Sequence, residues 1–143
     1  MEALQRFIDG QRFGYEIALK EMKAGQKQNH WIWYIFPQIQ GLGHSPNSQY
    51  YGINGLNEAK AYLQHPVLGA RLREITQEVL NHAGKSIYAI MGAPIDAKKF
   101  KSSMTLFDAI SPDDIFAKAL DTFFKGERDK HTLGRLTAIN KTE

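Results

Sequence analysis

The stretch "HPVLGARLREITQEVLNHAG", residues 65–84, is the clearest helix in the sequence and decides the fold class. Pro66 suits the first turn of a helix, where its missing N–H is not needed, and Gly84 is typical of a helix end. Between them, apolar side chains recur at a spacing of three or four residues. These residues are Leu68, Leu72, Ile75 and Val79. The pattern predicts an amphipathic helix with one buried face.

Helical patterns also precede this stretch. The segment "FGYEIALKEMKAG" places Tyr15, Ala18 and Met22 on one stripe, and Gly25 is expected to end the helix. The segment "NGLNEAKAYLQ" follows, with Asn54 as the expected N-cap. Both segments therefore predict helices.

The C-terminal part of the chain continues in the same way. A helix is expected over 94–110, and a second begins at "SPDD", where Ser111 caps and Pro112 takes the first position. A last helix is expected to begin at Asp129. No segment shows convincing strand alternation. The sequence thus predicts an all-α fold in one domain, 1–143, with six or seven short helices in an irregular orthogonal bundle.

Composition narrows the function classes. The chain has 43% hydrophobic and 23% charged residues, values of an ordinary globular protein. It has no cysteine, which excludes disulfides and thiolate-bound metals. The N-terminus does not resemble a signal peptide, and no segment approaches the length of a membrane span, so we expect a cytoplasmic protein without a membrane partner. The net charge of +3 is spread along the chain and does not favour nucleic-acid binding.

The most unusual segment is "HWIWYIFPQIQGLGHSPNSQYYGI", residues 30–53. Asn29 could cap a short helix there, and Pro37 would end it near Phe36. The aromatic side chains have two interpretations: they form the centre of the core, or they form the wall of a binding site. The glycines likewise permit either turns or close approach to a ligand.

The polar side chains in this segment leave several alternatives. His30 is either a buried, hydrogen-bonded imidazole or a site residue. His44 and His65 are interpreted as cap or turn residues. The single "GLG" lacks the features of a dinucleotide fingerprint or a phosphate loop, so both are rejected. The histidine spacings do not suit a metal site, and no cofactor is indicated.

The segment "IDAKKFKSSMTLFDAI" carries a second candidate site. At about 100° per residue, Asp96, Lys99 and Ser103 form one strip beside the apolar face, and Ser102 and Thr105 point away. One interpretation is structural: Lys99 pairs with Asp96, and Ser103 bonds to a helix carbonyl. The other is a cation and a hydroxyl suited to a phosphate or carboxylate, with a lysine–serine nucleophile as a further possibility.

Five segments carry a family resemblance. "HWIWYIFPQIQGLG", "YYGI", "AKAYLQHPVLGARL", "KSSMTLF" and "FFKGERDKHTL" occur in this order and cover nearly the whole chain. In these motifs the chain resembles the domain-of-unknown-function family numbered 1810. The resemblance implies an all-α fold and no established activity. The many polar and glycine positions in the motifs favour a site over pure packing.

Two further labels bear on function. Members of that family are sometimes labelled calpastatin, but inhibitor repeats of that kind are extended and disordered, unlike this unrepeated chain. The segment "EAKAYLQHPVLGARL" gives a weaker similarity to NADAR proteins, which resemble N-glycosidases acting on ADP-ribose-type compounds. That similarity is an analogy only.

Two functions from different classes remain. The first is a small-molecule binding protein, with possible hydrolase activity, for an anionic nucleotide or ADP-ribose-type ligand. Aromatic side chains would stack on the ligand ring. The alternative is a non-catalytic protein-interaction module in which the motif residues are structural. The catalytic candidates are His30, Lys99 and Ser103. The expected ligand-binding residues are Trp33, Gln38, Gly41, Gly43, Ser45, Tyr51, Arg71 and Ser102.

Overall fold

Helices make up almost all regular structure in the computed structural model, which describes the backbone of residues 2–142 and the side chains of residues 3–139. In this range the one strand-like pairing is an isolated bridge between Ile39 and Ile53. The helices are α1 (Glu2–Ala24), α2 (Ile32–Ile35), α3 (Pro46–Tyr50), α4 (Leu56–Gln64), α5 (Leu68–Leu80), α6 (Ile87–Met91), α7 (Pro94–Ile110), α8 (Ile115–Phe124) and α9 (Lys130–Thr142). The all-α prediction is confirmed. Nine helices are described rather than six or seven, because α2, α3 and α6 are too short to show a periodic pattern.

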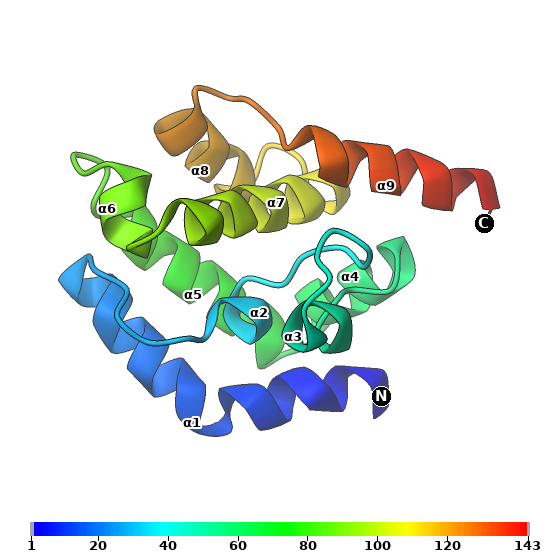
Figure 1. Ribbon diagram of the computed structural model, residues 1–143, viewed down its shortest axis with the longest axis horizontal. Helices are drawn as coiled ribbons and strands as arrows, with labels where there is room; N and C mark the ends of the chain where they lie inside the picture. The colour runs from blue at the N-terminus through cyan, green and yellow to red at the C-terminus, as the bar shows by residue number, and fades with distance from the viewer. Residues whose placement is uncertain (1, 143) are drawn as a thin grey trace.

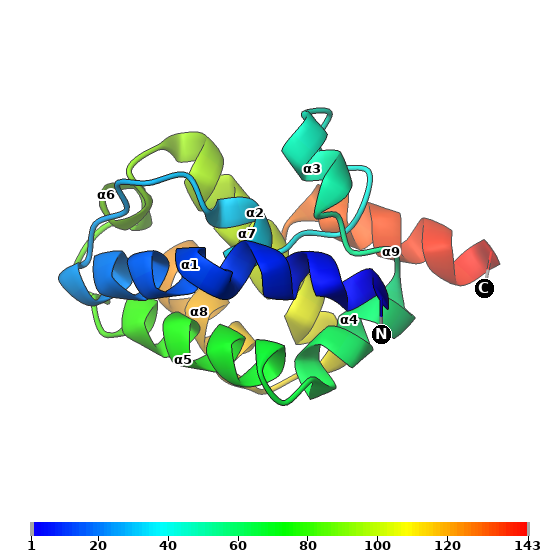
Figure 2. The same ribbon diagram turned by 90° about the horizontal axis from the view of Figure 1, so that it is seen from below.

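Helix α7 runs through the middle of the bundle (Figure 1). It contacts α2, α4, α6, α8 and α9, whereas α1 packs on α5 and α2. Figure 2 shows α1 and α5 side by side, with α3 projecting from the body of the protein near α9. The C-terminal part of α9 extends beyond the bundle (Figure 1). Helix α7 therefore links the core to the segments around α3 and α9.

The core is built largely from aromatic rings around α7. Phe100 and Phe107 are fully buried, and the ring of Phe36 meets that of Phe100 edge-on, with centroids 4.9 Å apart. Full burial of such a side chain stabilises the fold by roughly 1.5–3 kcal/mol. Trp31 is also buried, while Trp33 is only partly buried. The structural interpretation of the aromatic segment therefore holds for Trp31 and Phe36.

Glu21 of α1 fixes the segment that leads into α2. Its side chain is 8% exposed and accepts hydrogen bonds from the backbone N–H groups of Gln28 (2.7 Å) and Asn29 (3.0 Å). It also accepts from Asn29 Nδ2 (2.5 Å) and Trp31 Nε1 (2.9 Å). Burial alone would raise the pKa of Glu21, but these hydrogen bonds outweigh it and lower the pKa to about 2. Asn29 thus donates hydrogen bonds to Glu21 and does not cap α2, whose N-cap residue is Trp31.

Two expected helix starts are wrong, each for a backbone reason. Helix α4 begins one residue later than Asn54 would allow, because Gly55 occupies the N-cap position with a φ of 142° that favours glycine. Helix α8 is capped by Asp114, whose side chain accepts from the N–H of Ile115, rather than by Ser111. Asp113 has a φ of 58°, which interrupts the helical path after Pro112.

The remaining boundaries agree with the patterns except at the end of α5, which stops at Leu80, four residues before the expected Gly84. Gly25 follows the last residue of α1, and α7 spans the expected residues, Pro94–Ile110. Pro66 precedes α5, and the ring nitrogen Nδ1 of His65 accepts from the N–H groups of Val67 and Leu68. His65 is therefore a capping residue, as its sequence position suggested.

Candidate functional site

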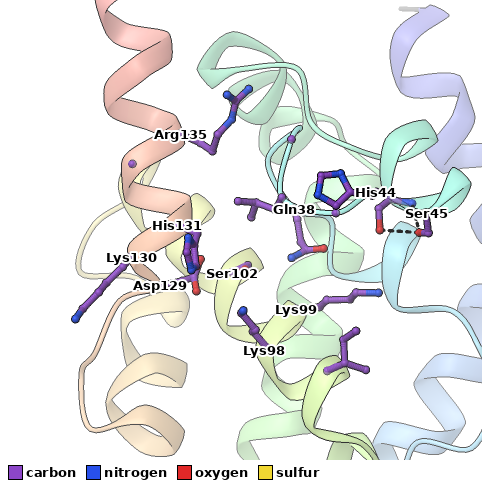
Figure 3. A pocket seen from close by; sticks show the side chains of 16 residues that line it. Gln38, His44, Ser45, Lys98, Lys99, Ser102, Asp129, Lys130, His131 and Arg135 are labelled. Carbon is purple, nitrogen blue, oxygen red and sulfur yellow. Dashed lines mark hydrogen bonds between the residues drawn. The ribbon is translucent and has the colours of Figure 1, made fainter.

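A cavity of about 610 Å³ opens between α7, the beginning of α9 and the loop that contains α3 (Figure 3). Its walls come from three segments that are distant in sequence. The lining residues are Gln38, Gly41, Leu42, Gly43, His44, Ser45, Ser48, Ile95, Lys98, Lys99, Ser102, Asp129, Lys130, His131, Gly134 and Arg135. We refer to this cavity as the α7–α9 pocket.

Helix α7 contributes one face to the pocket. Ile95, Lys98, Lys99 and Ser102 line it, at spacings of three and four that place them on one side of a helix. The expected strip ran one residue out of phase, through Asp96, Lys99 and Ser103. Asp96 instead pairs with Lys27, with Nζ 2.9 Å from Oδ2.

The two neighbouring serines of α7 have different surroundings. Ser102 is 1% exposed, lines the pocket and forms no hydrogen bond with any described residue. Ser103 is fully buried in the core, and its hydroxyl has no hydrogen-bond partner there. We expected Ser103 to be the site hydroxyl and Ser102 to point away. In this pocket the opposite holds, because Ser102 lines it and Ser103 does not.

Asp129 stands at the start of α9 and joins it to α7. Its carboxylate oxygen Oδ2 accepts from the backbone N–H of Thr132 (2.9 Å) and from its hydroxyl (2.6 Å). Its own N–H donates to Thr105 Oγ1 on α7 (2.9 Å). Asp129 is 6% exposed and lines the pocket. This buried polar cluster fixes the carboxylate at one end of the cavity.

The loop that covers the pocket is held at its base and at its rim. At the base, Gln40 N–H donates to Ile53 O, and Ile53 N–H donates to Gln38 O, both at 2.8 Å. At the rim, Arg135 Nε donates to Gln40 O at 3.1 Å. Gly41 permits this contact, because it has a φ of 97° and a Cβ there would lie 2.8 Å from Arg135 Nε. The loop is thereby tied to α9 across the pocket.

Two other loop residues have local structural roles as well. Ser45 caps α3, because its hydroxyl accepts from the N–H of Ser48 (3.1 Å). Gly43 lies against the same residue, where a Cβ would come within 2.5 Å of Ser48 Oγ. Figure 3 shows the Gln38 side chain and Lys98 directed toward the space between the three segments. Gln38 and Lys98 are therefore placed to meet a ligand.

The pocket carries a surplus of positive charge. Lys98, Lys99, Lys130 and Arg135 line it against the single carboxylate of Asp129. The surplus of three equals the formal net charge of the whole chain. None of these four cations forms a salt bridge with a described residue, although Asp96 acts on Lys99 and Glu127 on Lys130 over longer distances. A concave surface lined by one sign of charge attracts ligands of the opposite sign.

Lys99 links the pocket to the aromatic segment. Its ammonium lies 5.0 Å from the ring centroid of Trp33, a cation–π contact. Burial lowers the pKa of Lys99, and Lys27 adds to this, while Asp96 acts in the opposite direction. A cation that has lost part of its hydration gains more from an incoming anion than a fully solvated one does.

Trp33 and Tyr51 line a second, much smaller cavity. It has a volume of about 10 Å³ and shares Gln38, Gly43 and Ser48 with the α7–α9 pocket. The indole N–H of Trp33 is buried without a partner. The volume suffices for about one water molecule. Trp33 does not line the larger pocket, so the expected stacking of a ligand ring on Trp33 is not supported there. The ring-bearing side chains that line the larger pocket are those of His44 and His131.

The predicted site residues thus divide into those that converge and those that do not. Three of them lie outside both cavities. His30 is exposed on the connection between α1 and α2, and Ser103 is in the core. Arg71 of α5 lies 4.9 Å from the ring centroid of Tyr15. The predicted residues that do line the α7–α9 pocket are Gln38, Gly41, Gly43, Ser45, Lys99 and Ser102.

Sequence reasoning missed all but one of the seven charged or ionisable lining residues, the exception being Lys99. The missed residues are His44, Lys98, Asp129, Lys130, His131 and Arg135. One signal was present, because Lys98 shares the helical stripe of Lys99 and Ser102. The start of α9 offered no such signal, since its approach to α7 is a long-range contact.

Two further properties concern metals and membranes. In the described part of the chain, no three His, Asp or Glu side chains are grouped so that they could hold a metal ion. None of the described helices is both long enough and apolar enough to cross a bilayer.

Comparison with known proteins places this fold in a family. A family model described as "Protein of unknown function (DUF1810)" matches residues 1–136. The chain belongs to the DUF1810 family. The conserved hypothetical protein Rv1873 from Mycobacterium tuberculosis has a similar crystal structure, with a TM-score of 0.90 and 43% sequence identity. The similarity covers 94% of this chain and 96% of that one. No curated protein sequence matches this DUF1810 chain.

Proposed function

We propose that this DUF1810 protein binds a small anionic ligand, a phosphate-bearing molecule of nucleotide size, in the α7–α9 pocket. The observation that carries the proposal is the surplus of three positive charges in a concave site without ion-pair partners. The cavity of about 610 Å³ lies within the roughly 300–1,000 Å³ typical of small-molecule sites. Buried, unpartnered Ser102 and the inward-pointing Gln38 supply polar contacts for orientation.

The nucleotide or ADP-ribose class follows from the combination of size, charge and polar groups. A phosphate or pyrophosphate would be met by Lys98 and Lys99 at one side and by Arg135 at the other. In place of the aromatic segment, the rings available for stacking are His44 and His131. This class is therefore the one we propose to test first.

Binding is tested by thermal shift, followed by calorimetric titration, with AMP, ADP-ribose and uncharged adenosine. A ligand at 100 times its dissociation constant should stabilise the protein by about 2.7 kcal/mol. Lys98→Met and Lys99→Met each remove one cation while keeping an apolar stem. Each should weaken phosphate-bearing ligands by about 1.5–3 kcal/mol, the usual range for a hydrogen bond to a charged group. The exposed Lys118 of α8 does not line the pocket, so Lys118→Met is the matched control.

The outcomes separate the proposal from its rival. Equal loss of affinity in Lys98→Met, Lys99→Met and Lys118→Met would show that binding is a general surface effect. Binding of adenosine as tight as that of AMP would contradict the role of charge. If no phosphate-bearing ligand shifts the melting temperature, the alternative function, a protein-interaction module, is favoured. One observation supports that alternative: Phe13 and Ile17, one turn apart on α1, are 79% and 46% exposed.

Hydrolysis of the pyrophosphate bond of an ADP-ribose-type ligand is the second part of the proposal: water attacks one phosphorus, and the other phosphate leaves with the bridging oxygen. The pocket brings Asp129 and His131 into one lining, and both are side chains able to transfer protons. They take the place of His30 and Ser103, which lie outside it. Phosphorus NMR of ADP-ribose incubated with the protein measures turnover directly. An unchanged spectrum alongside measurable binding would reduce the proposal to a binding protein.

A further inference from the structure

Asp129 is the one side chain in the lining of the α7–α9 pocket whose charge would repel a simple anion. Its carboxylate is 6% exposed and stands in a lining that otherwise carries four cations. An inorganic anion placed among those cations would gain from them and lose from Asp129. The carboxylate therefore calls for an explanation beyond anion binding.

Helix capping explains only part of Asp129. Oδ2 serves the start of α9, because it accepts from both the N–H and the hydroxyl of Thr132. Ser, Thr or Asn at this position would supply the same single acceptor without a charge. Oδ1 receives no hydrogen bond from any residue that the structure describes. The second oxygen is available to a donor on a ligand.

Ser102 supplies a second polar atom of the same kind. It is 1% exposed, lines the pocket and has no hydrogen-bond partner among the described residues. Because the residue is buried but its hydroxyl faces the pocket without a protein partner, the hydroxyl is free to pair with a ligand or water. Figure 3 shows Ser102 between Asp129 and the Gln38 side chain. These three residues form a polar patch inside the cationic pocket.

The surrounding charge decides which donor this patch would accept. An ammonium group could donate to Asp129, but Lys98 and Lys99 in the same lining would repel it. A hydroxyl group donates without charge and can also accept from Ser102 or from the Gln38 amide. The complementary ligand therefore combines a phosphate with neighbouring hydroxyls.

We infer that Asp129 is a specificity-determining residue that accepts a hydrogen bond from a sugar hydroxyl, so that the pocket selects phosphorylated sugars over bare phosphates. This inference rests on the proposed function, because the phosphate itself is held by the cations. Asp129 Oδ1 accepts from one hydroxyl, and Ser102 pairs with a second. Oδ2 remains with Thr132, which keeps the carboxylate fixed in the unliganded protein.

The experiment compares two phosphate monoesters of the same charge, ribose 5-phosphate and methyl phosphate, by calorimetric titration of the whole chain. The wild-type protein should prefer ribose 5-phosphate by about tenfold or more, the value of one hydrogen bond to a charged group. Asp129→Asn keeps a side chain that caps helices well, so α9 should stay folded. This variant should bind ribose 5-phosphate more weakly and methyl phosphate more tightly, because the repulsive charge has gone.

The opposite signs exclude a merely structural role for Asp129. A damaged site would lose affinity for both esters, and that result would overturn the inference. The exposed Asp121 of α8 provides the matched control Asp121→Asn, which should change neither affinity. If Asp129→Asn fails to fold, Ser102→Ala replaces it and should lower the affinity for ribose 5-phosphate alone. An unchanged preference in Ser102→Ala would then contradict the inference.

The two proposals fail in distinguishable ways. Equal binding of the two esters to the wild-type protein would refute sugar selection and leave anion binding in place. Binding of neither ester at millimolar concentration would overturn the proposed function and this inference together.

Discussion

Replacing Glu21 by Gln should destabilise the protein in a pH-dependent way. Glu21 accepts four hydrogen bonds that hold the connection between α1 and α2, including the one from the indole N–H of buried Trp31. Its pKa falls from the usual 4.5 to about 2. By linkage, that difference corresponds to roughly 3 kcal/mol of folding free energy at neutral pH. Glu21→Gln keeps the shape but loses the charge, so we expect about this loss at pH 7.

The sign of the pH dependence follows from the lowered pKa. The folded state favours ionised Glu21, so its contribution is complete above pH 4.5 and is lost as the pH falls from 4.5 toward 2. The difference in unfolding free energy between the wild type and Glu21→Gln should therefore shrink over this interval. Urea unfolding at pH 7, 4 and 3 measures it, provided that both proteins remain folded without urea. A difference that is absent at pH 7, or equally large at pH 3, would refute the reasoning.

Two further substitutions test the pocket geometry. Gly41→Ala should lower stability by about 1–2 kcal/mol in urea unfolding, because the φ of 97° disfavours any Cβ; wild-type stability would contradict this backbone conformation. The new methyl group should also displace Arg135 from Gln40 O. Ser103→Ala should raise stability by about 1 kcal/mol, because it removes a buried hydroxyl without a partner and Ala favours helices. Loss of ligand affinity in Ser103→Ala would show that the core serine contributes to the site after all.

The fold was predictable because its signals are local. The stripe of Leu68, Leu72, Ile75 and Val79 identifies α5, and Pro94 and Ile110 mark the ends of α7 as the structure has them. Helix starts were less predictable where one residue's backbone angle decides them. Neither the φ of Gly55 nor that of Asp113 can be derived from residue type alone.

The site was predictable only in part, for two physical reasons. A one-residue error of phase on α7 exchanges Ser102 for Ser103, since neighbouring residues differ by about 100° around a helix axis. Both serines are buried, so an expectation about which of them is buried would not have revealed the error of phase. The contribution of α9 depends on a buried contact between Asp129 N–H and Thr105 Oγ1, 24 residues away in sequence. No periodic pattern signals such a contact.

The distribution of unfavourable features supports a binding site in the α7–α9 pocket. Cations that face one cavity repel each other, and a buried carboxylate costs free energy. Packing alone does not require a hydroxyl at Ser102 or a charge at Asp129, the two buried positions of this group. Lys98 and Lys99, Ser102 and Asp129 nevertheless meet in one lining. Ser103 carries a buried hydroxyl without a partner in the core, and nothing in the structure explains it. A polyhydroxylated anion would remove the costs in the pocket together, because each of these groups would then gain a partner.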